Sequence, residues 1–323
     1  MPYSKSIKVK CGFTIAIFAA MFSFAEVHAA APSSCLINTA NAPSAARHEG
    51  KRFTVVTEGI GPDIVLIPGL SNPREVWAMT NTGLRNCFTV HTIQIRGFGD
   101  DAGINADGPV LEPFAKELAD YIDDEIIGKG RAKPVIIGHS LGGLSALMIG
   151  ARYPELPGKI MVVDAVPFVA TIFNPVATVD MVRAQAQALS GGMRASYRAE
   201  KPPFDGKDPG AYSQSGFYSN SPNGRTLVAA WSYAADSRVT AQAFYDAMTT
   251  DMRSELPNII APVTLLYAQD DSAMTAQTAQ AAFEPQYKGT AKFEAKMITG
   301  SRHFIMLDQP EKFAAALDMF LAH

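Results

Sequence analysis

One short segment, GHSLGG at residues 138–143, constrains the fold of this chain more than any other. It follows an apolar run, Val135–Ile137, and opens a segment with helical spacing at 140–153. A serine with glycines two residues away on each side, between a strand and a helix, fits the G-x-S-x-G nucleophile elbow. Ser140 must then take a strained backbone conformation, in which side chains at 138 and 142 would collide. The segment predicts an exposed, reactive serine; the alternative is an ordinary glycine-rich turn.

Short apolar runs rich in β-branched residues recur along the chain, and they predict strands at 52–58, 63–69, 88–95, 134–138, 159–166, 262–268 and 292–298. Several runs are continuous rather than alternating, which is typical of strands buried on both faces of a parallel sheet. Segments with helical spacing, among them 112–126 and 310–322, alternate with these runs. The pattern predicts an α/β fold with a mostly parallel central sheet flanked by helices.

One connection in this alternation is far too long for a simple crossover. Residues 167–261 contain helical patterns around a Pro-, Gly-, Ser- and Tyr-rich middle. We predict a mainly helical cap inserted into a core formed by residues 51–166 and 262–323, over the carboxyl ends of the strands. We expect the cap aromatics to line or cover the ligand pocket, or to form the cap's own core: Tyr212, Phe217, Tyr218, Trp231, Tyr233 and Phe244.

The amino-terminal segment has the three-part layout of a secretory signal peptide. Three lysines precede an apolar stretch from Cys11 to Ala25, and small residues close it, so that cleavage after Ala29 is expected. We predict a signal peptide at 1–29, a tail at 30–50, and a periplasmic or secreted protein without stable membrane insertion once the signal is removed. The alternative is an uncleaved membrane anchor, although the apolar stretch is short for one.

Charge and cysteine content limit the kinds of ligand and cross-link that this chain can have. Removing residues 1–29 takes away three lysines and one glutamate, so the formal charge changes from −3 to −5. A mildly acidic chain without a basic cluster has no evident means of binding nucleic acid. Export would leave Cys35 and Cys87, and an oxidising compartment favours a disulfide between them, with two unpaired thiols as the alternative. No cysteine or histidine cluster has the spacing of a metal site.

A serine nucleophile needs a base, and the base needs a carboxylate that orients it. His303 lies between the last predicted strand and the last predicted helix, which returns it to the same edge of the sheet as Ser140. Acids at the carboxyl ends of strands are the candidates for the third residue. We prefer Asp271, and Asp270 and Asp164 remain alternatives.

Two backbone amides are expected to stabilise an oxyanion. The first is that of Leu141, at the start of the helix that follows Ser140. The second is that of Leu70, after Gly69 in the turn that follows the strand at 63–69.

With these residues in place, the chain resembles the α/β-hydrolase superfamily over essentially its whole mature length. The matching segments are LIPGL at 66–70, IRGFGD at 95–100, GHSLGG, YAQDD at 267–271 and SRHFIMLDQPEKF at 301–313. The chain departs from the family pattern at Pro68, where many members have histidine. The resemblance implies a cofactor-free serine hydrolase that cleaves a small-molecule ester or lactone through an acyl-enzyme. The alternatives are a cofactor-free haloperoxidase-like perhydrolase and a non-catalytic binding protein on the same fold.

Overall fold

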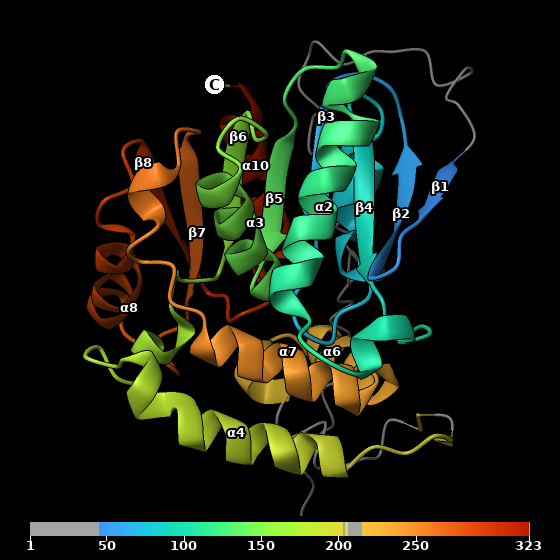
Figure 1. The fold of residues 1–323 in the computed structure, drawn as a ribbon. Helices are drawn as coiled ribbons and strands as arrows, with labels where there is room; N and C mark the ends of the chain where they lie inside the picture. The colour runs from blue at the N-terminus through green and yellow to red at the C-terminus, as the bar shows by residue number, and fades with distance from the viewer. Residues whose placement is uncertain (1–44, 203, 206–214, 323) are drawn as a thin grey trace, which may run out of the picture. The chain divides into compact units, whose positions relative to one another are not determined.

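The computed structural model describes residues 45–202, 204–205 and 215–322, all within one compact unit that spans Ala31–His323. These residues form an eight-stranded sheet in the order β1-β2-β4-β3-β5-β6-β7-β8 (Figure 1). The strands are β1 (Ala46–Glu49), β2 (Phe53–Glu58), β3 (Asp63–Ile67), β4 (Thr89–Ile95), β5 (Val135–His139), β6 (Lys159–Val163), β7 (Val263–Gln269) and β8 (Phe293–Thr299).

From β4 to β8 all neighbouring strands are parallel, whereas β1 and β2 extend one edge in antiparallel pairing. The residues of β3 are buried throughout, and those of β5 and β6 are buried after a half-buried first residue, which confirms the prediction of a parallel sheet covered on both faces. Residues 46–49 belong to the tail that the sequence analysis predicts at 30–50. The structure makes them a short, largely exposed edge strand, ARHE, whose charged side chains suit a sheet edge.

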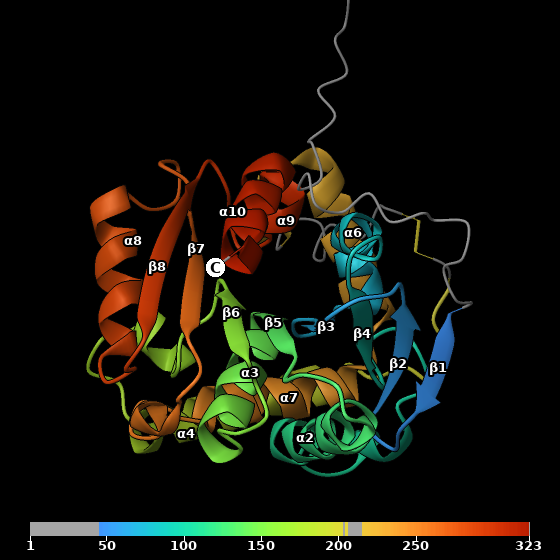
Figure 2. The ribbon, with the colours of Figure 1, turned by 90° about the horizontal axis from the view of Figure 1, so that it is seen from above.

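Helices cover the two faces of the sheet, as Figure 2 shows. On one face, α2 (Leu111–Glu125) and α3 (Leu141–Arg152) belong to one large apolar core. On the other face, α1 (Ala78–Leu84), α9 (Ile305–Asp308) and α10 (Pro310–Ala322) contribute to a second core. The central strands contribute buried side chains to both cores. This packing on both faces holds the ends of the strands in place relative to one another.

The remaining elements complete the frame. The helix α8 (Ala276–Phe283) packs against β7. Short 3-10 helices lie in the connections: η2 (Arg74–Trp77), η3 (Gly103–Ala106), η4 (Ile127–Lys129), η5 (Val169–Ile172), η6 (Leu256–Asn258) and η7 (Glu284–Tyr287).

Three helices between β6 and β7 lie across the carboxyl ends of the parallel strands (Figure 1): α4 (Val179–Ala195), α6 (Pro222–Ala234) and α7 (Ser237–Thr249). Each begins at a residue whose side chain accepts a hydrogen bond from the first turn, namely Thr178, Ser221 and Asp236. The sequence analysis predicts a helical insertion here from the length of the connection and its helical patterns, and the structure adds the capping residues, which the sequence analysis does not use.

Polar contacts hold the insertion to the sheet domain. The carboxylate of Asp246 on α7 accepts hydrogen bonds from the amides of Val110 (2.7 Å) and Leu111 (3.0 Å), where α2 begins. A carboxylate at a helix amino end also interacts favourably with the helix dipole. The amide of Asp236 donates to the carbonyl of Gly97 at 2.7 Å, in the turn after β4. The insertion is thus docked at the edge of the sheet where β4 ends.

Several expectations concern residues outside the described ranges. These are the signal peptide at 1–29, most of the tail at 30–50, Cys35 and the cap residue Tyr212. Cys87 is disulfide-bonded, and both other cysteines of the chain lie outside the described residues. The pairing of Cys35 with Cys87 stays a prediction.

Candidate active site

Ser140 stands between β5 and α3 in the strained turn that the sequence predicts. Its φ of 53° and ψ of −117° lie in a region that non-glycine residues rarely occupy. A Cβ added at Gly138 would collide with the backbone of Gly142, and a Cβ at Gly142 would collide with the carbonyl of Ile67. Both glycines are therefore required by close backbone approach, and their absence of side chains leaves the serine at the carboxyl edge of the sheet.

The neighbouring strand fixes the turn. The amide of Ser140 donates to the carbonyl of Val163, the last residue of β6, at 2.9 Å. The carbonyl of Ser140 accepts the amide of Leu144 at 3.0 Å, which starts the hydrogen-bond ladder of α3. The serine itself is half-buried. The residue that follows β6, Asp164, consequently lies close to the serine turn.

His303 contacts Asp164. The Nδ1 atom of His303 is 2.7 Å from Oδ2 of Asp164, whose side chain is almost fully buried. The other carboxylate oxygen accepts the amide of Ala268 at 2.7 Å, so both oxygens are held in place. Asp164 also has a positive φ of 49°. A carboxylate bonded to Nδ1 fixes the tautomer of the ring and stabilises its charged form.

The preferred acid of the sequence analysis, Asp271, is not the partner of His303. It is exposed, and its carboxylate accepts the side-chain amide of Gln269 at 2.7 Å. The strand β7 continues to Gln269, and the amides of Ala273 and Met274 donate back to the carbonyl of Asp270, so the two aspartates belong to a tight turn beyond the strand. By contrast, Asp164 follows β6 directly, beside the strand that ends at the serine. The adjacency of the strands thus places the alternative Asp164, rather than Asp271, in contact with His303.

The other alternative, Asp270, has a different partner. Its carboxylate accepts hydrogen bonds from the amide (3.0 Å) and hydroxyl (2.8 Å) of Ser272 and from Nε of Arg302 (3.0 Å). The bonds from Ser272 are the main reason that the pKa of Asp270 is lowered to about 2. Asp270 therefore remains ionised and supports the residue before His303 rather than His303 itself.

The turn after β3 lies against the serine. A Cβ at Gly69 would be 3.1 Å from Cβ of Ser140, and the amide of Asn72 closes the turn on the carbonyl of Gly69 at 3.2 Å. Ser71 has a φ of 59°, and its hydroxyl is 2.9 Å from that of Thr240 on α7. Leu70 is therefore in the turn next to Ser140. The roles of the Leu70 and Leu141 amides stay predictions, because they concern an oxyanion that forms only during a reaction.

The insertion reaches the loop that carries His303. The carbonyl of Tyr218 accepts the amide of Phe304 at 3.0 Å, and the Tyr218 ring centroid is 5.8 Å from that of His303. Trp231 stands 6.3 Å from Phe304 by ring centroids. Of the predicted cap aromatics, Tyr218 and Trp231 thus come near the candidate site, whereas Phe217 is mostly exposed.

Sequence reasoning missed Asp308, at the end of α9. Its carboxylate accepts hydrogen bonds from the hydroxyl of Ser219, from the amides of Asn220 and Ser221 at 3.2 Å each, and from the amide of Arg302 at 2.9 Å. One carboxylate therefore ties the insertion to the residue next to His303. No periodicity or motif marks the contacts to residues 219–221, because they join segments more than 80 residues apart.

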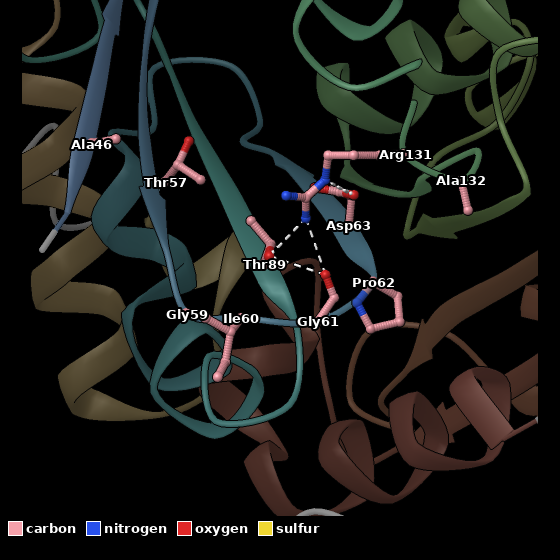
Figure 3. A pocket seen from close by; sticks show the side chains of 10 residues that line it. All are labelled: Ala46, Thr57, Gly59, Ile60, Gly61, Pro62, Asp63, Thr89, Arg131 and Ala132. Carbon is pink, nitrogen blue, oxygen red and sulfur yellow. Dashed lines mark hydrogen bonds and ion pairs between the residues drawn. The ribbon is translucent and has the colours of Figure 1, made fainter. Parts of the chain in front are cut away.

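A pocket lined by described residues lies at the opposite end of the sheet from Ser140, and Figure 3 shows the residues that line it. Its volume is about 640 Å³, and its lining includes Asp63 and Thr89, which begin β3 and β4. The guanidinium of Arg131 donates to Asp63 (2.6 Å), to the carbonyl of Gly61 (3.0 Å) and to Thr89 (2.8 Å). The charged groups of this pocket are thus paired with one another, and none of the candidate catalytic residues lines it.

Two kinds of feature are absent from the described part of the chain. In it, no three or more histidine, cysteine, aspartate or glutamate side chains are grouped so that they could bind a metal ion. Likewise, none of its helices combines the length and the hydropathy that crossing a bilayer requires.

Comparison with known proteins gives a consistent result. The model of the alpha/beta hydrolase family matches residues 64–316. The pimeloyl-[acyl-carrier protein] methyl ester esterase of Vibrio vulnificus (strain YJ016) is 25% identical over 82% of this chain and 96% of its own length. Among solved structures, a thermophilic esterase from Thermogutta terrifontis superimposes with a TM-score of 0.66 at 18% identity, covering 87% of this chain and 98% of that one.

The enol-lactonase from Burkholderia xenovorans LB400 gives a TM-score of 0.60 at 17% identity, covering 83% of this chain and 97% of that one. At such identities the two structures show a shared fold. The family match extends over most of the chain and includes the serine turn, Asp164 and His303. The chain belongs to the alpha/beta hydrolase family.

Proposed function

We propose that this chain is an exported serine hydrolase that cleaves a carboxylic ester or lactone through an acyl-enzyme, with Ser140, His303 and Asp164 as its triad. One observation carries the proposal: Nδ1 of His303 is 2.7 Å from Asp164 at the sheet edge where the strained Ser140 stands. An imidazole bonded to a buried carboxylate, beside a serine held in a strained turn, is the arrangement that nucleophilic catalysis requires.

In this proposal the two ring nitrogens of His303 have different tasks. The Nδ1–H group of His303 donates a hydrogen bond to Asp164, so Nε2 is left with a lone pair that can accept the hydroxyl proton of Ser140. The Ser140 oxygen then attacks the carbonyl carbon, and the carbonyl electron pair moves onto the oxygen. The amides of Leu141 and Leu70 are the proposed donors to that oxyanion.

Collapse of the tetrahedral intermediate completes the first half of the reaction. The carbonyl forms again, the bond to the alcohol oxygen breaks, and the leaving alkoxide takes the proton from Nε2 of His303. In the second half, a water molecule gives a proton to Nε2 of His303 and attacks the acyl carbon. The second tetrahedral intermediate then collapses, the bond from the acyl carbon to the Ser140 oxygen breaks, and that oxygen takes the proton back from Nε2 as the acid leaves. For a lactone, the alcohol and the acid leave as one molecule.

The relatives support an ester-like substrate. The Vibrio vulnificus relative bears the name of a methyl ester esterase, and its similarity extends over most of both chains. The aromatic side chains of Tyr218 and Phe304 beside His303 favour a substrate with an apolar group next to the carbonyl. No observation favours perhydrolysis or a purely binding role over hydrolysis.

A covalent probe tests the proposal. A fluorophosphonate should label the full-length protein once, and Ser140→Ala should abolish both the label and the turnover of p-nitrophenyl acetate. The matched control is Ser145→Ala, one turn further along α3, whose buried hydroxyl only donates to the carbonyl of Leu141 at 2.9 Å. We expect this control to keep both properties. A wild-type protein that takes up no label would refute the hydrolase proposal.

Further measurements separate the alternatives and the location. A rate with peroxide that greatly exceeds the rate with water would favour the perhydrolase. Export predicts that the protein recovered from outside the cytoplasm begins at Ala30, which amino-terminal sequencing can read. A mature protein that retains Met1 would contradict export by a cleaved signal.

A further inference from the structure

His139, the residue before the serine, has a fully buried side chain that contacts the loop of His303. Its ring centroid is 4.6 Å from that of His303 and 4.8 Å from that of Phe304. Its Nε2 is 3.0 Å from the main-chain carbonyl oxygen of His303. Its Nδ1 has no hydrogen-bond partner among the described residues.

These contacts determine the protonation of the ring. A carbonyl oxygen can only accept, so the hydrogen bond to His303 requires that Nε2 of His139 carries a proton. Burial, and secondarily the neighbouring His303, lower the pKa of His139 well below its usual value. The ring is therefore neutral, with a donor at Nε2 and a bare lone pair at Nδ1.

We propose that His139 is a positioning residue for His303, acting through the hydrogen bond from its Nε2 to the His303 carbonyl. This inference rests on the proposed function. Residues 300–304 between β8 and α9 have no regular secondary structure, so the backbone of His303 must be held by contacts from outside the loop. Asp164 fixes the His303 ring at Nδ1, and His139 fixes its main chain. With both contacts, the ring of His303 is held in one orientation, in which Nε2 is proposed to face the hydroxyl of Ser140.

The same ring supports the opposite side of the site. A Cβ at Gly69 would lie 2.8 Å from Nδ1 of His139 and 3.1 Å from Cβ of Ser140. The turn that carries Leu70 therefore rests against His139. One enclosed, neutral imidazole thus separates the base loop from the predicted oxyanion turn and sets their spacing.

Three substitutions test the inference. In His139→Gln the side-chain amide reaches the position of Nε2 and can donate to the His303 carbonyl. In His139→Asn the amide reaches only the position of Nδ1, and in His139→Leu the donor is absent. The structural control is His91→Leu, because His91 is also buried and hydrogen-bonded, to Asp63 (2.7 Å) and Tyr121 (2.8 Å), but contacts no candidate catalytic residue.

The readouts are kcat and KM for p-nitrophenyl acetate, the rate of fluorophosphonate labelling, and the thermal midpoint. We expect His139→Leu and His139→Asn to lower kcat and the labelling rate about 10- to 100-fold, with KM nearly unchanged, because a small displacement of a catalytic group has effects of that size. His139→Gln should recover most of the rate. His91→Leu should lower the thermal midpoint without changing kcat at temperatures where it is folded.

Two outcomes would overturn the inference: folded His139→Leu with wild-type kcat, or His139→Gln that is as slow as His139→Leu despite the same thermal midpoint. Should His139→Leu not fold, the Gln and Asn pair decides alone, since both are amides and differ only in reach. A wild-type protein inert to probe and ester would refute the proposed function instead. A crystal structure of His139→Asn would then still show whether the His303 carbonyl has moved.

Discussion

Backbone strain is concentrated at the proposed catalytic residues. Among the described residues, the non-glycine residues with positive φ are Ser71, Ser140 and Asp164. Each such conformation costs on the order of 1–3 kcal/mol and persists only where the surroundings fix it. The amides of Ser140 and Asp164 donate to the carbonyls of Val163 and Leu266, and the hydroxyl of Ser71 bonds that of Thr240. The sheet and the insertion together impose the strain, as expected of a site that is held ready for chemistry.

The assignment of the acid gives the first prediction. Asp164→Asn should lower kcat by about 10³- to 10⁴-fold, because an amide at this place cannot hold His303 in the tautomer with its proton on Nδ1. Asp271→Asn should leave kcat within about twofold, since the Asp271 carboxylate only accepts from Gln269. Steady-state rates with p-nitrophenyl acetate measure both. The reverse ranking of the two variants would refute Asp164 as the acid.

Asp164 and Asp271 also show which part of the site could not be predicted from the sequence. Motif and chain order led to Ser140 and His303, because a strained serine turn needs glycines and a base loop must return to the same edge. Of the three candidate aspartates, two follow a predicted strand and Asp164 lies near the end of another, and nothing local separated them. The distinction depends on β6 being the neighbour of β5 and on β7 continuing to Gln269. Strand order and strand ends are properties of the folded sheet.

The glycines of the serine turn give a second prediction. Gly138→Ala should destabilise the protein by about 1–3 kcal/mol, because its Cβ would collide with the backbone of Gly142 rather than with a side chain that can move. Gly191→Ala is the matched control: Gly191 is inside α4 with open space around it, and alanine is favoured in a helix by roughly 0.5–1 kcal/mol. Urea unfolding of both variants measures the difference. Equal stability of the two would show that the turn tolerates a side chain.

At the scale of elements, the long-range contacts of the insertion matter most. Its helical patterns could be recognised in the sequence, as could its place between two predicted strands. The segment 215–221 could not be paired with the His303 loop, since the partners Ser219 and Asp308 are 89 residues apart and lie outside any periodic pattern. Likewise, β1 was missed because four mostly exposed residues give no hydrophobic alternation.

The third prediction concerns this junction. Asp308→Ala should lower kcat/KM about 10-fold through displacement of Arg302 and the adjacent His303. It should also speed hydrogen exchange at the amides of Asn220 and Ser221, which lose their acceptor. The control is Asp180→Ala on α4, whose carboxylate is almost fully exposed. Activity assays and exchange read by mass spectrometry test both. Unchanged exchange at 220 and 221 would show that Asp308 does not hold the insertion.

At the scale of the whole molecule, Asp270 accepts hydrogen bonds from both the sheet domain and the insertion. The free energy of unfolding therefore depends on whether this carboxyl is ionised. Its hydrogen-bond donors come from the turn after β7 (Ser272), from the His303 loop (Arg302) and from the insertion (Asn220). The bonds from Arg302 and Asn220 join segments that are 32 and 50 residues away and therefore require the folded chain. Together, the bonds from the three donors lower the pKa of Asp270 from its usual 3.8 to about 2, with the bonds from Ser272 contributing most. A carboxyl whose folded pKa is depressed adds stability above its unfolded pKa, and this contribution is lost as the pH falls through the folded pKa.

The last prediction follows from that sign. Asp270→Asn, a neutral mimic of the protonated acid, should cost about 1–2 kcal/mol of unfolding free energy at neutral pH. The deficit relative to wild type should stay constant down to about pH 5 and shrink as the pH falls from about 4 to 2. The reason is that the carboxyl of the unfolded wild-type chain is protonated first, and that of the folded protein only near its own lower pKa. Urea unfolding across this range measures it, with Asp271→Asn, one residue further in the same turn, as the control. A deficit that persists undiminished at pH 2 would mean that the ionised Asp270 does not join these three parts of the molecule.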